Sequence, residues 1–185
     1  MNKIFVLSEE NTKSLLEMEE VIETVENVYK EKSLGSGKVF PLVFHEFERA
    51  VADMDIKSGT LDAMGVYGLK LVSWFGENQK KNIPALSGSV MILDRKTGLP
   101  LGLINAEHMT GMRTGAAGAI GAKVLARKDS EVMLMVGAGH QAAYQIRAMQ
   151  AVFPNLKKVM VHDPIQFENA SRFVKDFSYK KEGID

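Results

Sequence analysis

The sequence contains no cysteine, which excludes disulfide bonds, thiolate metal sites and a cysteine nucleophile. It has no excess charge of either sign, because 23 Lys and Arg residues balance 23 Asp and Glu residues. Nucleic acids and anionic membranes attract basic surfaces, so neither is expected as a partner. No apolar run approaches the roughly 20 residues that a membrane-spanning helix needs. In MNKIFVLSEENTK, acidic residues directly follow a short apolar run, unlike a signal peptide. These absences predict a cytoplasmic location.

What is present is an ordinary globular composition of 185 residues, with 45% hydrophobic and 25% charged residues, enough for one domain or two small ones. Apolar residues at helical spacing, beginning with Met18, Val21 and Ile22, predict a helix that ends near Lys32. Residues 51–64 are polar and mixed, so we expect a loop with at most a short strand. Runs rich in β-branched and aromatic residues predict strands at 38–47, 65–75, 85–94 and 99–106, the last two forming a hairpin around RKTG.

The order of predicted elements changes in the last third of the chain. From Glu131 the expected order is a strand (131–136), a glycine turn (137–139), a helix (140–152), a strand (157–162) and a helix (165–178). This order is the βαβ opening of a doubly wound sheet. The predicted fold class is therefore α/β, with an α+β domain at 1–128 followed by the first part of a Rossmann dinucleotide-binding domain at 129–185.

A helix rich in glycine and alanine is predicted at 108–127. Gly111, Gly115, Gly118 and Gly121 all fall within it, although glycine costs a helix roughly 1 kcal/mol relative to alanine. Glycines in such a helix indicate that something approaches its backbone closely. A tight contact with another helix is the commoner explanation, and a bound ligand is the other.

The stretch VGAGHQAAY matches the dinucleotide pattern G-x-G-x-x-A with Gly137, Gly139 and Ala142. The first glycine makes the tight turn, the second exposes bare backbone to a diphosphate, and the third small residue lets helix and strand pack closely. Diphosphate oxygens then meet the free N–H groups at the start of the helix. Asp163 ends the next strand, where an acid binds both ribose hydroxyls and favours NAD over NADP. The competing interpretation is an ordinary β-turn-α unit with a surface aspartate, and we expect His162 to be a bystander.

These motifs together resemble the ornithine cyclodeaminase/mu-crystallin family. That family carries D-x-x-T-G-x-P-x-A, then L-T-x-x-R-T-A-A, then a strand and G-x-G-x-Q. The matching positions here are Asp94, Thr97, Gly98, Pro100, Met109, Thr110, Arg113, Thr114, Gly137, Gly139, His140 and Gln141, with Lys70 on an earlier strand.

The resemblance implies an enzyme that uses a bound nicotinamide cofactor to move hydride at the α-carbon of a small amino or imino acid. Ornithine cyclodeamination, giving proline and ammonia, is the reaction of the naming member. An amino-acid or imino-acid dehydrogenase and a ketimine reductase are alternatives. Two alternatives are not enzymes. One is a non-catalytic, mu-crystallin-like protein that binds nucleotide and a ligand, and the other is an inactive fragment. The resemblance also implies that 1–128 binds substrate and pairs into a homodimer.

The site residues follow from the same resemblance. Lys70 is expected to contact the substrate and to act as acid or base. The planar guanidinium of Arg113 can bind the carboxylate of the substrate. The alternative anion for Arg113 is the cofactor diphosphate. The residues expected at the cofactor are Arg113, Thr114, Gly137, Gly139, His140, Gln141 and Asp163.

Two departures from the family pattern stand out. Many members carry an arginine on an early strand as a second carboxylate contact, and our alignment places Phe44 there. His45 is expected on the opposite face of the strand, and Arg49 reaches only if the strand register shifts. The second departure is that the family's catalytic aspartate lies beyond the equivalent of Asp185. We therefore expect these 185 residues to be a portion of a longer protein or the product of a truncated gene.

Overall fold

The computed structural model describes residues 3–177, which form two compact units. The first unit comprises Met1–Leu15 and Asn27–Met109, and the second comprises Leu16–Glu26 and Thr110–Asp185. Packing therefore groups the glycine-rich helix with the glycine turn. The functional division at 128/129 remains a prediction. None of the helices in the described residues combines the length and hydropathy required to cross a membrane.

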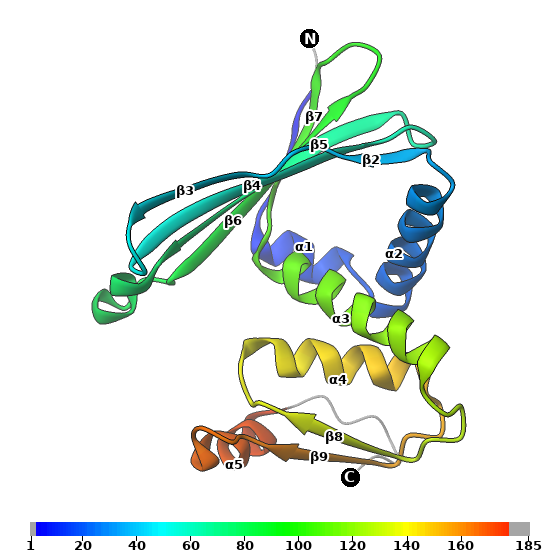
Figure 1. The fold of residues 1–185 in the computed structure, drawn as a ribbon, viewed down its shortest axis with the longest axis vertical. Helices are drawn as coiled ribbons and strands as arrows, with labels where there is room; N and C mark the ends of the chain where they lie inside the picture. The colour runs from blue at the N-terminus through cyan, green and yellow to red at the C-terminus, as the bar shows by residue number, and fades with distance from the viewer. Residues whose placement is uncertain (1–2, 178–185) are drawn as a thin grey trace. The chain divides into compact units, whose positions relative to one another are not determined.

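The first unit is built on a seven-stranded sheet with the order β1-β7-β6-β5-β4-β2, and β3 also pairs with β4 (Figure 1). All neighbours are antiparallel except β1 and β7. The strands are β1 (Phe5–Leu7), β2 (Gly37–Val39), β3 (Val43–Glu48), β4 (Ala52–Leu61), β5 (Val66–Phe75), β6 (Leu86–Asp94) and β7 (Pro100–Asn105). Helices α1 (Glu9–Leu15) and α2 (Met18–Ser33) precede β2, and the 3-10 helix η1 (Gly76–Lys81) follows β5.

The expectation of a loop at 51–64 is wrong, because β4 occupies ten of these residues and pairs along its whole length with β5. Its acidic and basic residues, such as Asp55 and Lys57, are uncommon in strands and conceal the alternation with Met54 and Ile56. The strand expected at 38–47 is divided into β2 and β3, with Pro41 in the break. Proline cannot donate to a sheet ladder. Three other elements, β1, α1 and η1, were not predicted.

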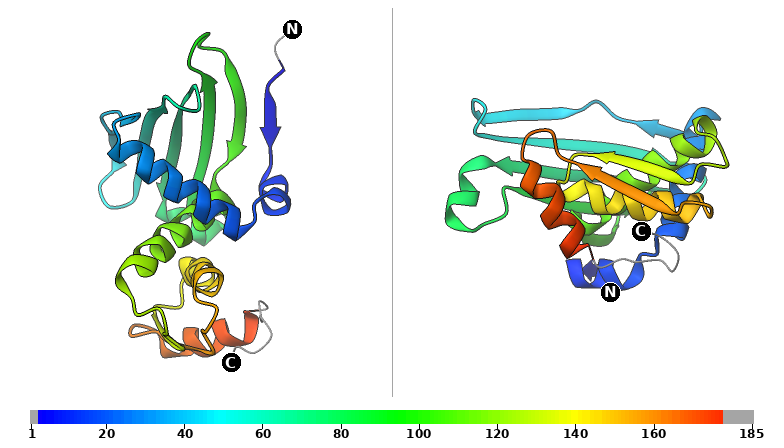
Figure 2. Two further views of the ribbon diagram at one scale, coloured as in Figure 1. Left: turned by 90° about the vertical axis from the view of Figure 1, so that its right-hand side faces the viewer. Right: turned by 90° about the horizontal axis from the view of Figure 1, so that it is seen from below.

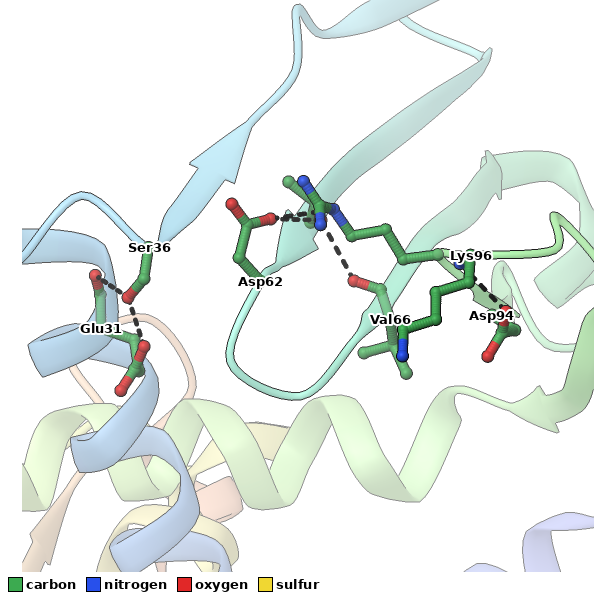
Figure 3. A network of polar contacts seen from close by, with 8 residues as sticks. Glu31, Ser36, Asp62, Val66, Asp94 and Lys96 are labelled. Atoms are coloured by element: carbon green, nitrogen blue, oxygen red, sulfur yellow. Dashed lines mark hydrogen bonds and ion pairs between the residues drawn. The ribbon is translucent and has the colours of Figure 1, made fainter.

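The helix predicted from Met18 and the β6–β7 hairpin are confirmed. The hairpin turn explains the motif Asp94-x-x-Thr97-Gly98 in local terms. One carboxylate oxygen of Asp94 accepts hydrogen bonds from the Lys96 and Thr97 amides and from the Thr97 hydroxyl, at 3.0, 2.7 and 2.8 Å. Figure 3 shows the contact of Asp94 with Lys96. Gly98 has φ +73°, a left-handed conformation that favours glycine. This part of the family motif therefore builds a turn.

An ion pair connects the turn after β4 with the turn after β6 at the same end of the sheet. Arg95 forms an ion pair with Asp62, with 3.1 Å between Nε and Oδ1. Nearby, the Ser36 hydroxyl lies against the Glu31 side chain and 3.0 Å from the Glu31 carbonyl oxygen, which fixes the exit from α2.

The second unit confirms the predicted βαβ order. It contains β8 (Val132–Val136), α4 (His140–Val152), β9 (Lys158–His162) and α5 (Phe167–Asp176). β8 and β9 are parallel neighbours, and α4 lies between the strand pair and α3 (Glu107–Leu125) (Figures 1 and 2). The mixed α/β fold class is therefore confirmed. The expected end of the last helix, residue 178, lies outside the described residues.

Close packing of α3 on α4 explains three of the four helix glycines. A Cβ added to Gly111 would overlap the Tyr144 ring, one on Gly115 would lie 2.5 Å from the Tyr144 carbonyl oxygen, and one on Gly118 would overlap the Gln145 amide. A Cβ on Gly121 meets nothing within 4 Å. The helix–helix explanation is thus the one that the structure supports. The buried cluster at this contact consists of Met18, Ile22, Met112, Ala116, Ala119, Tyr144 and Ala148.

Candidate functional site

The glycine turn of the second unit joins β8 to α4. Gly137 has φ +97°, which strongly favours glycine, and its amide donates to the His162 carbonyl of β9 at 2.7 Å. Gly139 precedes α4 in an extended conformation, φ −81° and ψ −175°. A Cβ on either glycine would meet no atom within 4 Å. Bare backbone at the start of a 13-residue helix therefore faces open space, which fits a bound diphosphate.

Asp163 follows β9 and closes one side of this turn. One carboxylate oxygen accepts a hydrogen bond from the Ala138 amide at 3.2 Å. The other accepts from the Ile165 and Gln166 amides at 3.0 and 2.9 Å. These hydrogen bonds, that of Gln166 first, hold the pKa of Asp163 below its usual value. The Asp163 side chain is thus a hydrogen-bond acceptor of the turn, with its carboxylate form favoured.

His140 and Gln141 form the first turn of α4. The His140 ring is exposed and lies 5.3 Å from the Tyr144 ring, centroid to centroid. Gln141 is half-buried, and its Oε1 is buried with no hydrogen-bond partner among the described residues. A buried amide oxygen without a partner costs free energy, so a donor from a bound molecule would satisfy it.

Arg113 and Thr114 lie on α3, in the same unit as the turn. Arg113 is exposed and forms no ion pair with any residue in 3–177. Its guanidinium is available to an anion. The Thr114 hydroxyl donates to the Thr110 carbonyl at 2.7 Å, and the Thr114 carbonyl accepts from Gln145 at 3.1 Å. Both polar groups of Thr114 therefore serve the helix and its contact with α4.

Lys70 belongs to the first unit, where it lies half-buried on β5. It lines a cavity of about 520 Å³ between the sheet and the end of α2. Alternation along the strands places Lys70, Gly68 and Gly59 on one face, which we call the cavity face. Gly59 and Gly68 are register partners, so the floor of the cavity has no side chain there. The apolar walls consist of Val28, Val39, Leu61, Val66, Val90 and Ile92.

Sequence reasoning missed the charged residues beside Lys70. Lys57 of β4 is its register partner, and both line the cavity. The Lys57 ammonium forms an ion pair with Asp55, two residues away on the same face, with 2.7 Å between Nζ and Oδ2. Recognition of the strand at 52–61 would have placed all three side chains together.

The residues of the first departure lie as follows. Phe44 is on β3, where it is the register partner of Asp55 and is 59% exposed. His45 pairs with Met54, so it faces the opposite side of the sheet, as predicted. Arg49 lies in the turn after β3. The cation nearest to Lys70 in strand register is therefore Lys57.

The predicted site residues fall in both units. The structure brings Gly137, Gly139, His140 and Asp163 together around one turn, with Arg113 and Thr114 in the same unit. Lys70 belongs to the other unit, where its neighbours are Lys57 and Asp55.

Several known proteins are similar to this chain in sequence and in fold. An alanine dehydrogenase of Archaeoglobus fulgidus is 35% identical over 169 residues, which cover 91% of this chain and 51% of the relative. A Thermococcus litoralis Δ1-pyrroline-2-carboxylate reductase, solved in complex with NADH and L-proline, superposes with a TM-score of 0.87 at 36% identity, covering 95% of this chain and 54% of that one. An archaeal alanine dehydrogenase dimer with bound NAD has a TM-score of 0.85 at 35% identity, covering 93% and 52%.

The chain thus spans about half the length of the relatives that it matches. The sequence pattern of the ornithine cyclodeaminase/mu-crystallin family matches residues 2–184. Because this match covers nearly every residue, the chain belongs to the ornithine cyclodeaminase/mu-crystallin family.

Proposed function

We propose that this chain is part of an NAD-dependent enzyme that oxidises a small α-amino acid or reduces the corresponding imino acid. The observation that carries the proposal is the bare glycine backbone at Gly137 and Gly139, which opens at the start of α4 beside the Asp163 carboxylate. Bound NAD would accept or donate the hydride. NAD is favoured over NADP because an ionised aspartate at this position accepts from ribose hydroxyls and repels a 2′-phosphate.

The roles of the side chains follow from their charge and exposure. The amides of the turn and the exposed guanidinium of Arg113 bind anionic oxygens. Lys70 contacts the substrate from the apolar cavity, where half-burial strengthens its interaction with a carboxylate or carbonyl oxygen. A lysine in such surroundings can also move a proton to or from the substrate nitrogen.

Net oxidoreduction is our first choice of reaction, and ornithine cyclodeamination is the second. The similarity to an alanine dehydrogenase and to a pyrroline-2-carboxylate reductase at 35% and 36% identity supports the first. The family description supports the second. The two reactions share hydride transfer and differ in whether ammonia is lost while the cofactor returns to its starting state.

A homodimer of the first unit is part of the proposal. Val43, Phe47, Leu71, Phe75 and Leu103 lie on the sheet face opposite the cavity face, and each is more than a third exposed. The Phe47 and Phe75 rings stack 5.7 Å apart. Exposed apolar patches of this kind mark protein–protein contacts. Sedimentation of the purified protein tests this part.

The test of the function is an assay with the full-length protein, NAD and a panel of L-alanine, L-proline and L-ornithine. Reduction of NAD supports net oxidation, whereas proline and ammonia without net NAD reduction support cyclodeamination. Lys70→Ala should abolish turnover and leave NAD binding nearly intact. The matched control is Lys80→Ala, an exposed lysine of η1 paired with Glu77, which should retain activity. Equal loss of turnover and of NAD binding in Lys70→Ala contradicts the proposed role of Lys70.

A further inference from the structure

Two lysines stand directly opposite each other on the cavity face of the sheet. Lys57 of β4 and Lys70 of β5 are register partners, and such partners have Cβ atoms about 4.5–5.5 Å apart. Like charges in this arrangement repel and destabilise a sheet. An anion bound between the two ammonium groups would offset this repulsion.

Asp55 is the ion-pair partner of Lys57. Its Oδ2 lies 2.7 Å from the Lys57 ammonium, and its side chain is 24% exposed against 56% for Lys57. The less exposed carboxylate therefore fixes the end of the more exposed lysine. An ammonium held in place loses less rotamer entropy when it binds a ligand, so Asp55 prepares Lys57 for binding without occupying all three of its donors.

The surroundings select the kind of anion. Besides the two lysines, the cavity is lined largely by aliphatic side chains, with Gly59 and Gly68 at its floor. Its other polar lining residues are Lys32, Lys38, Ser58, Thr60 and Tyr67. A small carboxylate with a carbon skeleton fits this combination, because its charged end meets the lysines and its skeleton meets the apolar wall. A fully hydrated inorganic anion gains nothing from that wall.

We propose that Lys57, positioned by Asp55, is a second cation for the substrate carboxylate beside Lys70, and is therefore a specificity-determining residue. This inference rests on the proposed function for the identity of the ligand as an amino or imino acid. The carboxylate accepts hydrogen bonds from both ammonium groups. Asp55 is a positioning residue that acts through Lys57.

The test compares variants of the full-length protein. Lys57→Gln should raise KM for the amino acid about tenfold, equivalent to about 1.4 kcal/mol, with a smaller change in kcat and unchanged NAD binding. Lys57→Arg should retain much of the affinity, because a guanidinium also binds a carboxylate. Asp55→Asn should also raise KM for the amino acid, because Lys57 loses the carboxylate that positions it. Lys80→Gln removes a lysine that is likewise paired with a nearby carboxylate, at 2.5 Å from Glu77, and should leave KM unchanged.

A carboxamide comparison separates charge recognition from a structural role. Wild-type protein should bind pyruvate more tightly than pyruvamide in a calorimetric titration, and Lys57→Gln should reduce that preference about tenfold. Equal weakening for acid and amide, or an unchanged preference, overturns the inference, as does a failure of the wild-type protein to bind pyruvate. A protein that prefers pyruvate through Lys57 but transfers no hydride with any amino acid contradicts the proposed function and leaves this inference standing.

Discussion

The Asp163 carboxylate and the Ala138 amide are joined by a hydrogen bond of 3.2 Å between Oδ2 and N. This contact ties the end of β9 to the glycine turn that follows β8, although the two residues are 25 positions apart. The acid that we expect at the ribose therefore also holds the turn that we expect at the diphosphate. A substitution at this one position should disturb both parts of the nucleotide site.

Asp163→Asn should weaken NAD binding by about tenfold or more, because an amide replaces one acceptor oxygen and removes the negative charge. Preference for NAD over NADP should also fall, since the charge that repels a 2′-phosphate is gone. Fluorescence titration with both nucleotides measures this. Asp129→Asn, an exposed aspartate before β8, is the control. Unchanged NAD affinity in Asp163→Asn contradicts the nucleotide-site interpretation of Asp163.

The glycine turn could be predicted because its signals are local. Gly137, Gly139 and Ala142 lie within six residues, and their pattern between a strand and a helix describes one backbone shape. The sequence also predicts α2, α4 and the strands β5 to β9, which have clear periodicity or strand-forming residues. β4 was not found, because its pairing with β5 and β3 stabilises a segment whose charged residues disfavour a strand when it is considered alone.

The hairpin turn around Asp94 should make unfolding dependent on pH in acid. The hydrogen bond from the Thr97 hydroxyl, followed by that from the Thr97 amide, lowers the pKa of Asp94. A carboxyl whose folded pKa is depressed contributes stability above its unfolded value, near 3.9, and loses that contribution as pH falls through the folded pKa. The free energy of unfolding should therefore decrease below about pH 4.

Urea unfolding from pH 7 to pH 2 measures this dependence. Asp94→Asn should be less stable than wild type at pH 7, and the difference should shrink as pH falls, because the native carboxyl loses its charge as pH passes its lowered pKa. Parallel curves for the two proteins over the whole range contradict this account. Asp163 has a lowered pKa for the same kind of reason, so the Asp163→Asn variant should show the same convergence.

The Lys57–Lys70 pair shows why one residue of the proposed site cannot be predicted from the sequence alone. The family motif predicts a role for Lys70, whereas the proposed role of Lys57 depends on the β4–β5 register. Contacts between separate strands depend on pairing that one sequence does not display. Phe44, which our alignment places at the family's second carboxylate contact, lies on β3, after the break at Pro41 that separates β2 from β3.

Gly115→Ala should destabilise the second unit, because the added Cβ would lie 2.5 Å from the Tyr144 carbonyl oxygen. Backbone cannot move aside as a side-chain end can, so α3 and α4 would have to separate, at a cost of about 1–3 kcal/mol. Gly121→Ala is the matched control on the same helix, since its Cβ meets nothing within 4 Å. It should stabilise by up to about 1 kcal/mol through helix propensity. Urea unfolding of both variants should give opposite signs, and two stabilising changes would contradict the helix–helix explanation.

Gly139→Ala separates binding from folding. The conformation of Gly139 is extended, φ −81°, and an added Cβ meets no protein atom within 4 Å. Stability should therefore change by no more than about 0.5 kcal/mol, since lower chain entropy in the unfolded state offsets a poorer helix cap. The same methyl group would occupy the space in which we place the diphosphate, so NAD binding should weaken at least tenfold.

Gly137→Ala provides the contrast, because φ +97° at that position strains an alanine by about 1–2 kcal/mol whether or not nucleotide is present. Calorimetric NAD titrations and urea unfolding of the two variants distinguish the effects. Loss of NAD affinity without loss of stability in Gly139→Ala requires that a ligand contacts this backbone. Full NAD affinity in Gly139→Ala would mean that the diphosphate lies elsewhere, and the proposed function would lose the observation on which it depends.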